Sequence, residues 1–407
     1  MKILILTSRF GMGHYCAAEA IKEELKVSDS DDIIEIQDIV KVLFPSIYKL
    51  VYAFFNLFIC RFSGIYNFIN SFATKHEKTC LNRRILNKIN WLIKKYDPDL
   101  IISTWSAASR YVSIYKKKYE KNILLYTYIT DITAHDGWIT DASDMYFVAT
   151  KSTKESLIAR GIDDDKIIIN GIPVRQSFKQ DLQFKDFHRE NVLSFQSMDN
   201  NHEFLGEFNK DKKEILIMGG GLGLIPNIDN ILKSLYEVNN IHITIITGKN
   251  KKILKNIKRN YPKINAIGYT NKVDIYMKRA DLIITKPGGI SIFEAIYTTT
   301  PLYVMKPCLS QEIGNAEFIE KMFIGKIVWE NNFYIAEDII SLINNEKLME
   351  KMKYNMKSLQ NEILQLNLKK IYERNIQKYV DFNTADNYYI GLSDIWRYSH
   401  ITLQKVE

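Results

Sequence analysis

Cysteine, proline and long apolar runs are all scarce in this chain of 407 residues. It has 4 cysteines, none of them in a C-x-x-C pair, and 8 prolines. This cysteine usage favours neither a zinc site nor a disulfide framework, and it predicts reduced cytosolic thiols. The balance of 46% hydrophobic and 25% charged residues is typical of a soluble globular protein.

No apolar run reaches the length of a membrane span. The best candidate is LVYAFFNLFIC, residues 50–60, and it is about half of the roughly 20 residues that a spanning helix needs. Residues 1–15 hold too short an apolar run for a secretory signal and are expected to form a first strand. We therefore expect a protein that is soluble or lies on a membrane surface.

Acidic residues are scarce between Lys41 and Lys121, where 15 Lys and Arg stand against 4 Asp and Glu. This local excess is larger than the net charge of +8 of the whole chain. The first part of the same region is rich in aromatic residues, namely Phe44, Tyr48, Tyr52, Phe54, Phe55, Phe58, Phe62, Tyr66, Phe68 and Phe72. Cations mixed with aromatic rings suit an anionic surface, either phospholipid headgroups or nucleic acid.

Short β-rich runs alternate with helical patterns along the chain, which predicts an α/β fold with parallel sheets. The strands are expected within residues 2–7, 32–38, 99–104, 122–130, 144–150, 166–171, 214–220, 241–248, 264–268, 280–286 and 300–305. They form two successive units. The expected boundaries are a first domain at 1–178, a linker at 179–212, a second domain at 213–343, helices at 344–379 and a tail without assigned role at 380–407.

The first motif is TSRFGMGHYC, residues 7–16, where a strand gives way to a glycine-containing turn and a helix starts near His14. Backbone amides and a helix N-terminus then lie at the carboxyl edge of the sheet, where open α/β sheets bind ligands. Cys16 replaces the third glycine of a dinucleotide fingerprint, which argues against that cofactor. His14 is either a helix-capping residue or a general base, because imidazole titrates near working pH.

The second motif is EILIMGGGLGLIP, residues 214–226, in which Gly219, Gly220, Gly221 and Gly223 follow a strand. Glycines let a backbone approach phosphate closely, and the next helix N-terminus favours negative charge. A lysine is missing from the Walker position, so this is not an NTPase P-loop. Phosphate contact and a plain tight turn are the two interpretations.

The third motif, YTYITDITAHDGW at residues 126–138, ends a strand at the same sheet edge as His14. Asp131 could orient His14, bind a substrate hydroxyl or cap a turn. His135 and Trp138 follow it directly, and with Gly13 they are expected to face the acceptor of a reaction.

The fourth motif is TKPGGISIFEAI, residues 285–296, with a second polar group at the next helix start. The amides of Gly288 and Gly289 would lie at a helix N-terminus, and Glu294 could accept hydrogen bonds from a ribose diol. Amide and carboxylate groups that suit sugar hydroxyls open the following helix at Gln311, Glu312 and Asn315. Alternatively, these polar residues only cap helices at the protein surface.

Taken in order, the segments GMGHYCAAEAI, GIDDDKIIINGIPV, ILIMGGGLGL and ADLIITKPGGISIFEAI with QEIGNAEFI resemble glycosyltransferase family 28. The resemblance is to the group of monogalactosyldiacylglycerol synthases and processive diacylglycerol glucosyltransferases, relatives of the muramyl-pentapeptide GlcNAc transferase. It covers roughly residues 1–375 and implies the GT-B fold. In that fold two Rossmann-like domains face a central cleft, and a C-terminal helix crosses back to the N-terminal domain.

The resemblance also implies roles. The first domain takes the acceptor and the second takes a UDP-sugar, with His14 as base. The diphosphate lies at Gly219 to Gly223 and at Gly288 and Gly289, the ribose at Glu294 and the uracil near Tyr269. The hexose or neighbouring phosphate lies at Gln311, Glu312 and Asn315. Apart from the resemblance, Lys286 either stabilises the charge of the departing UDP or is merely solvated. The resemblance implies no metal ion. It also implies no cofactor, since the UDP-sugar counts as a substrate.

The sequence departs from the family pattern at Leu309 and Ser310, where Pro-Gly is usual. Glucose and galactose therefore both stay open as the transferred sugar. We expect inverting transfer to diacylglycerol by a protein that is peripheral on the inner face of the cell membrane, with an anionic membrane surface and no nucleic acid as partner. The alternatives are another lipid-linked or soluble acceptor, or a UDP-sugar 2-epimerase, against which the apolar region 42–72 argues.

Overall fold

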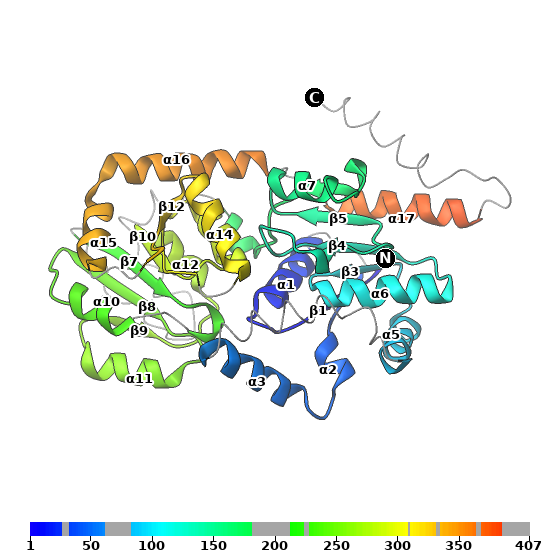
Figure 1. Cartoon of the computed structure of the whole chain (residues 1–407), viewed down its shortest axis with the longest axis horizontal. Helices are drawn as coiled ribbons and strands as arrows, with labels where there is room; N and C mark the ends of the chain where they lie inside the picture. Colours follow the sequence, from blue (N-terminus) through cyan, green and yellow to red (C-terminus); the bar gives the residue numbers. More distant parts are fainter. Residues whose placement is uncertain are drawn as a thin grey trace.

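The computed structural model describes residues 1–26, 32–61, 83–180, 212–223, 228–307, 310–330, 334–363 and 368–384. Within these residues the chain forms two parallel sheets of six strands each, arranged as two successive α/β units (Figure 1). The predicted α/β fold class with two parallel sheets is confirmed.

The first sheet has the strand order β2-β1-β3-β4-β5-β6, so the order reverses between β1 and β3. Ligands of such sheets bind where the order reverses. Its elements are β1 (Lys2–Thr7), α1 (Gly13–Leu25), β2 (Ile33–Asp38), α2 (Ile39–Leu43), α3 (Tyr48–Arg61), α5 (Arg83–Tyr96), β3 (Leu100–Ser103), α6 (Ser106–Tyr119), β4 (Leu124–Tyr128), η2 (Asp136–Trp138), β5 (Met145–Val148), α7 (Lys151–Ile158), η3 (Asp164–Lys166), β6 (Ile167–Ile169) and α8 (Gln176–Lys179).

The second sheet has the order β12-β11-β10-β7-β8-β9, and its order reverses between β7 and β10. Its elements are β7 (Lys213–Met218), η5 (Gly220–Leu222), α10 (Ile228–Leu235), β8 (Ile241–Ile246), α11 (Lys251–Asn260), β9 (Asn265–Ile267), α12 (Val273–Arg279), β10 (Leu282–Thr285), α13 (Gly289–Thr298), β11 (Leu302–Val304), α14 (Ser310–Lys321), β12 (Gly325–Ile327), α15 (Ile335–Asn344), α16 (Glu346–Glu362) and α17 (Leu368–Thr384).

The apolar runs form strands because both faces of each sheet are covered. In β1, Ile3 and Ile5 belong to a core cluster with residues of α1 and α17. Leu4 and Leu6 belong to a second cluster with residues of α5 and α6 on the opposite face. The alternation follows from the two-residue period of a strand, and it leaves the carboxyl end of the strand as the place for polar residues.

A third apolar cluster joins the two units. It contains Ile132, Ile172 and Phe178 of the first unit together with Phe293 of α13 and Ile363 after α16. The two units therefore pack against each other through a hydrophobic interface.

The last helix crosses back to the first unit, as the family resemblance implied. Figure 1 shows α16 running from the second unit toward the first, and α17 beside β4 and β5. Tyr372 of α17 is buried in the core of the first unit, and its hydroxyl hydrogen-bonds to that of Tyr128. Asn375 Nδ2 donates to the hydroxyl of Tyr126 over 3.0 Å.

Some elements differ from the expected ones. The strand β12 was not predicted, because its three residues include a glycine and a lysine and give no apolar run. The last helix extends to Thr384, beyond the expected end at Tyr379. Most of the expected linker (181–211) and most of the tail (385–407) lie outside the described residues.

Gly171 offers a test of the interface between the units. It has a left-handed φ of 69°, and a Cβ there would lie 3.0 Å from Phe293 Cε1 and 3.3 Å from Ile363 Cδ1. Gly161 also has a positive φ of 87°, but its Cβ would meet open space. Gly161→Ala should lower the free energy of unfolding by about 1 kcal/mol through backbone strain alone. Gly171→Ala should cost about 1–3 kcal/mol more through displaced side chains. Denaturant unfolding measures both, and equal losses would contradict a packed interface.

Candidate active site

The turn between β1 and α1 is built from two left-handed residues. Gly11 has a φ of 63° and Met12 a φ of 68°, and α1 begins at Gly13. A non-glycine residue in this region costs about 1–2 kcal/mol, so other contacts must hold it. The Met12 side chain packs against the second unit, with its Cγ 3.2 Å from the Cβ position of Gly221. The second unit therefore helps to hold the turn that precedes His14.

His14 lies in the first turn of α1, with Nδ1 2.8 Å from Oγ1 of Thr130. When Nδ1 carries the proton and donates to Thr130, Nε2 keeps its lone pair. Burial lowers the pKa of His14, and the negative charge of Asp131 partly opposes this shift. A neutral imidazole at neutral pH is a competent proton acceptor.

Asp131 contacts the loop after β4 rather than the imidazole of His14. Its Oδ2 accepts a hydrogen bond of 2.9 Å from Trp138 Nε1 and lies 3.9 Å from His135 Nε2. Orientation of His14 was one of the possible roles of Asp131, and in the structure Thr130 makes that hydrogen bond. Thr130 could not be predicted, because a threonine beside a carboxylate gives no distinctive signal. Asp131 acts on His14 through its charge.

Trp138 is fully buried, and its ring centroid lies 6.1 Å from that of His14. It was expected to face the acceptor, but its complete burial leaves no surface for one. His135 is partly exposed, and its Nδ1 accepts from the backbone N–H of Gly137 over 3.1 Å. Of the three residues expected at the acceptor, Gly13 and His135 are the accessible ones.

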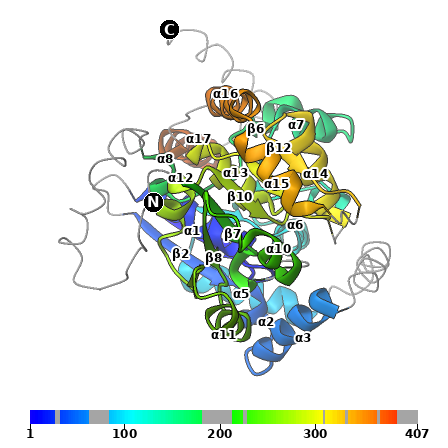
Figure 2. The same cartoon turned by 90° about the vertical axis from the view of Figure 1, so that its left-hand side faces the viewer.

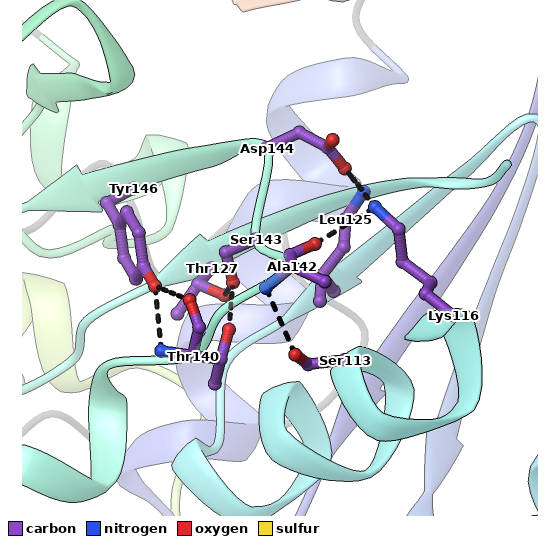
Figure 3. A network of polar contacts seen from close by, with 9 residues as sticks. All are labelled: Ser113, Lys116, Leu125, Thr127, Thr140, Ala142, Ser143, Asp144 and Tyr146. Carbon is purple, nitrogen blue, oxygen red and sulfur yellow. Dashed lines mark hydrogen bonds and ion pairs between the residues drawn. The ribbon is translucent and has the colours of Figure 1, made fainter. Parts of the chain in front are cut away.

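A buried polar network fixes the loop that follows Trp138 (Figure 3). It links Ser113, Lys116, Leu125, Thr127, Thr140, Ala142, Ser143, Asp144 and Tyr146. Thr127 of β4 pairs with Ser143 over 2.8 Å, and Lys116 forms an ion pair of 2.5 Å with Asp144. Buried hydroxyls and charges that satisfy one another rigidify the backbone between them. The loop between Trp138 and β5 is held in place in this way.

The glycine turn after β7 needs its glycines for steric reasons. Gly223 has a φ of 63°, and a Cβ there would overlap the backbone carbonyl of Thr247. Gly220 also has a positive φ, of 65°. Gly220 and Gly221 line a pocket between the two units. These features support the predicted approach of backbone amides to a phosphate.

The turn after β10 meets both the glycine turn and the first unit. Gly288 caps α13, which begins at Gly289, and a Cβ on Gly289 would lie 2.8 Å from the carbonyl oxygen of Thr130. Lys286 Cε lies 3.8 Å from the Cβ position of Gly220. A lysine ammonium and the N-terminus of α13 therefore converge at the place where the sequence predicts phosphate.

Residues of α14 hold this turn in position. Glu312 is buried, and its Oε1 lies 3.0 Å from Nζ of Lys286. Asn315 is also buried; its Nδ2 donates to the Pro287 carbonyl over 2.9 Å, and its Oδ1 accepts from Ile132 N–H over 3.4 Å. Both residues were expected at the hexose or the neighbouring phosphate, and in the structure they also have protein partners that orient the turn. The side chain of Gln311 lies outside the described part of the structure.

The pocket between the units has a volume of about 190 Å³. Residues from both units line it, including Gly13, Arg175, Gly220, Gly221, Tyr269 and Glu294. The carboxyl-edge loops of the two sheets thus enclose one site. Among the described residues, no group of three or more His, Cys, Asp or Glu is placed to hold a metal ion.

Glu294 is a carboxyl group of the pocket whose pKa is strongly raised. Burial raises its pKa to about 8; the charge of Asp274 adds to the rise, and that of Arg175 opposes it. Arg175 also donates to the Asn271 carbonyl over 2.8 Å, which fixes the loop beside Tyr269. The sequence analysis missed Arg175, because a single arginine after an apolar loop does not reveal which distant residues it reaches.

Two protein-family models match successive parts of the chain. Residues 14–174 match the model of monogalactosyldiacylglycerol (MGDG) synthase, and residues 214–375 match that of the glycosyltransferase family 28 C-terminal domain. A curated relative from Bacillus licheniformis, named processive diacylglycerol beta-glucosyltransferase, is 30% identical over 373 residues, which are 88% of this chain and 90% of that protein.

Solved structures show the same architecture at low identity. The glycotransferase of kitacinnamycin aligns with a TM-score of 0.60 and 12% identity over 92% of this chain and 98% of that one. A UDP-GlcNAc 2-epimerase from Neisseria meningitidis aligns with a TM-score of 0.53 and 18% identity over 93% and 100% of the two chains. The fold is therefore GT-B, an architecture that transferases and epimerases share, so the fold alone does not choose between them.

The sequence relationship is more specific than the fold. The chain belongs to the monogalactosyldiacylglycerol synthase group of glycosyltransferase family 28, as the family models and the 30% identity over most of its length show.

The raised pKa of Glu294 predicts a pH dependence of stability. Its ordinary value is 4.5 and its value in the folded protein is about 8, so the native state binds more protons between these two values. The free energy of unfolding should therefore fall as pH rises through this window, by at most about 1.4 kcal/mol per pH unit from this group. Glu294→Gln should remove this part of the slope. Unfolding curves of ligand-free protein at a series of pH values measure it, and identical slopes would refute the burial of a neutral carboxyl.

Proposed function

We propose that the protein transfers a hexose from a UDP-sugar to diacylglycerol with inversion at the anomeric carbon. One observation carries the proposal: the His14–Thr130 pair of the first unit faces the Gly288–Gly289 turn of the second, with the Gly289 Cβ position 2.8 Å from the Thr130 carbonyl. A base and a donor turn that meet across an interface suit a reaction between two substrates, one from each unit. The relatives named for diacylglycerol supply the acceptor class.

His14 removes the proton of the acceptor hydroxyl as that oxygen attacks the anomeric carbon. We assign this role to Nε2, because Nδ1 is engaged with Thr130. The lowered pKa keeps the imidazole neutral before the reaction, and the charge of Asp131 stabilises the imidazolium that forms. This pairing of a base with a nearby carboxylate matches the charge change of the step.

The UDP leaving group gains negative charge as the sugar departs. Amides of the turns at Gly220 and Gly288, the N-terminus of α13 and the ammonium of Lys286 surround its expected place. Glu312 holds Lys286 at one position, so little reorganisation is needed when charge develops. A preorganised donor of this kind contributes about 3–4 kcal/mol to transition-state stabilisation.

The nucleoside half of the donor is assigned to the pocket lined by Tyr269 and Glu294. The carboxyl group of Glu294 is placed to receive the ribose diol, and the backbone near Tyr269 to receive the uracil. Arg175 reaches this half from the first unit, so donor binding would also tie the units together. Closure of the units over the donor would exclude water, which otherwise competes with the lipid hydroxyl.

A lipid acceptor requires the protein to reach a membrane surface, and helices α3 and α5 supply apolar and cationic groups for this. Leu50 and Phe54 of α3 are more than half exposed, at 56% and 53%. In α5, Lys88 and Lys95 flank the exposed Trp91 ring, with their Nζ atoms 5.9 Å and 5.0 Å from its centroid. No helix in the described ranges has the length and apolar character of a membrane span. These groups suit a peripheral protein on the inner face of the cell membrane.

Product analysis tests the reaction. Labelled UDP-glucose and UDP-galactose incubated with diacylglycerol vesicles should yield a hexosyl-diacylglycerol. His14→Ala should lower turnover by about 10²–10⁴ and leave UDP binding near the wild-type value, because the base touches only the acceptor hydroxyl. Thr130→Val should cost less, since it only orients the ring. An epimerised UDP-sugar as product, or full turnover by His14→Ala, would refute the proposal.

Membrane docking through α3 has its own test. Replacing Leu50 and Phe54 together by serine removes apolar groups worth about 2 kcal/mol each when buried, so vesicle affinity should fall at least tenfold. Tyr354→Ser is the control, because Tyr354 is 72% exposed and its helix α16 lies at the opposite edge of the molecule from α3 (Figure 1). Co-sedimentation with anionic vesicles measures both variants. Equal affinity of the two would show that α3 does not dock.

A further inference from the structure

The outer face of α11 in the second unit is strongly cationic. Residues 249–263 contain seven Lys and Arg and no Asp or Glu. All seven are exposed: Lys249, Lys251, Lys252, Lys255, Lys258, Arg259 and Lys263. The apolar residues Ile253, Leu254 and Ile257 pack against the core of the second unit. The helix is therefore anchored on one side and presents a cationic face on the other, called here the α11 face.

Most charged surface helices are simply solvated and mix both signs of charge. Helix α16 is an example, since it carries Glu346, Glu350 and Glu362 among its lysines, and Lys353 Nζ lies 2.7 Å from Glu350 Oε1. The α11 face has no acid within its own stretch to offset it. Like charges at helical spacing destabilise a helix, and an external anionic surface relieves that repulsion.

The position of α11 identifies this surface. In Figure 1, α11 lies along the lower edge of the molecule, at the same level as α3 and α5 of the first unit. Figure 2, turned by 90° about the vertical axis, again places these helices at the bottom, while α16 lies at the top. Helix α11 of the second unit and helix α3 of the first unit therefore lie toward the same side of the molecule.

We infer that the α11 face is a second membrane contact, which binds the anionic headgroups of the lipid surface on which α3 docks. The inference rests on the proposed function, since it takes the membrane of the lipid acceptor as its partner. Exposed lysines without exposed large apolar groups suit the headgroup level, whereas Leu50 and Phe54 of α3 suit insertion.

This contact lies next to the donor pocket. Lys249 Nζ lies 5.7 Å from the ring centroid of Tyr269, and Tyr269 and Gly248 line the pocket. Binding of both units to one plane restricts their relative orientation while the base and the donor turn face each other. Anionic lipid thereby supports transfer as well as attachment.

The test compares two triple variants with the same change in charge. One replaces Lys251, Lys255 and Lys258 of α11 by glutamine; the control replaces the exposed Lys347, Lys351 and Lys357 of α16 by glutamine. Affinity is measured on phosphatidylcholine vesicles with and without phosphatidylglycerol, at low and high salt. The α11 variant should bind anionic vesicles about tenfold to a hundredfold more weakly and with a smaller salt dependence, because each lysine near such a surface contributes about fivefold in affinity. The control should bind as wild type.

Equal affinity of the two variants for anionic vesicles would overturn the inference. It would also be overturned if the α11 variant lost binding to duplex RNA while keeping its vesicle affinity, since the partner would then be a nucleic acid. Transfer to diacylglycerol in neutral detergent micelles should be the same in both variants and wild type. Absence of transfer by wild type would instead reject the proposed function, and unfolding curves confirm that both variants fold.

Discussion

The site depends on how closely the loop after β4 approaches the second unit, and two glycines permit that approach. A Cβ on Gly289 would lie 2.8 Å from the Thr130 carbonyl, and one on Gly314 would overlap the Thr133 side chain. Any side chain at these positions would push the units apart. Because Thr130 also holds His14, this spacing decides whether base and donor turn share one site.

Other contacts stabilise the same geometry from several directions. The amide of Asn315 joins the Pro287 carbonyl to the N–H of Ile132, and the left-handed Met12 packs on Gly221. A hydrophobic cluster drawn from both units and the returning helix α17 add apolar burial. This combination of polar and apolar contacts suits a protein that must hold two units together and still admit a nucleotide between them.

The sequence predicted the fold class, the positions of most strands along the chain and the polar motifs at their carboxyl ends, because buried parallel strands are apolar and ligand-binding loops follow them. The sequence does not reveal which polar side chains also bind other groups of the protein. Glu312 and Asn315 have the composition of sugar ligands but bind Lys286 and Pro287. Thr130 and Arg175 could not be predicted from the sequence, because their roles arise only from contacts with residues that are distant in sequence.

The central claim is a direct attack of a lipid hydroxyl on the sugar, assisted by His14 across the interface. The anomeric configuration of the glycolipid product tests this most directly, because UDP-hexoses carry an α-linkage and a single displacement inverts it. Proton NMR of the hexosyl-diacylglycerol should show a β-linkage. An α-linked product would require two displacements or a different attacking face, and would contradict the account.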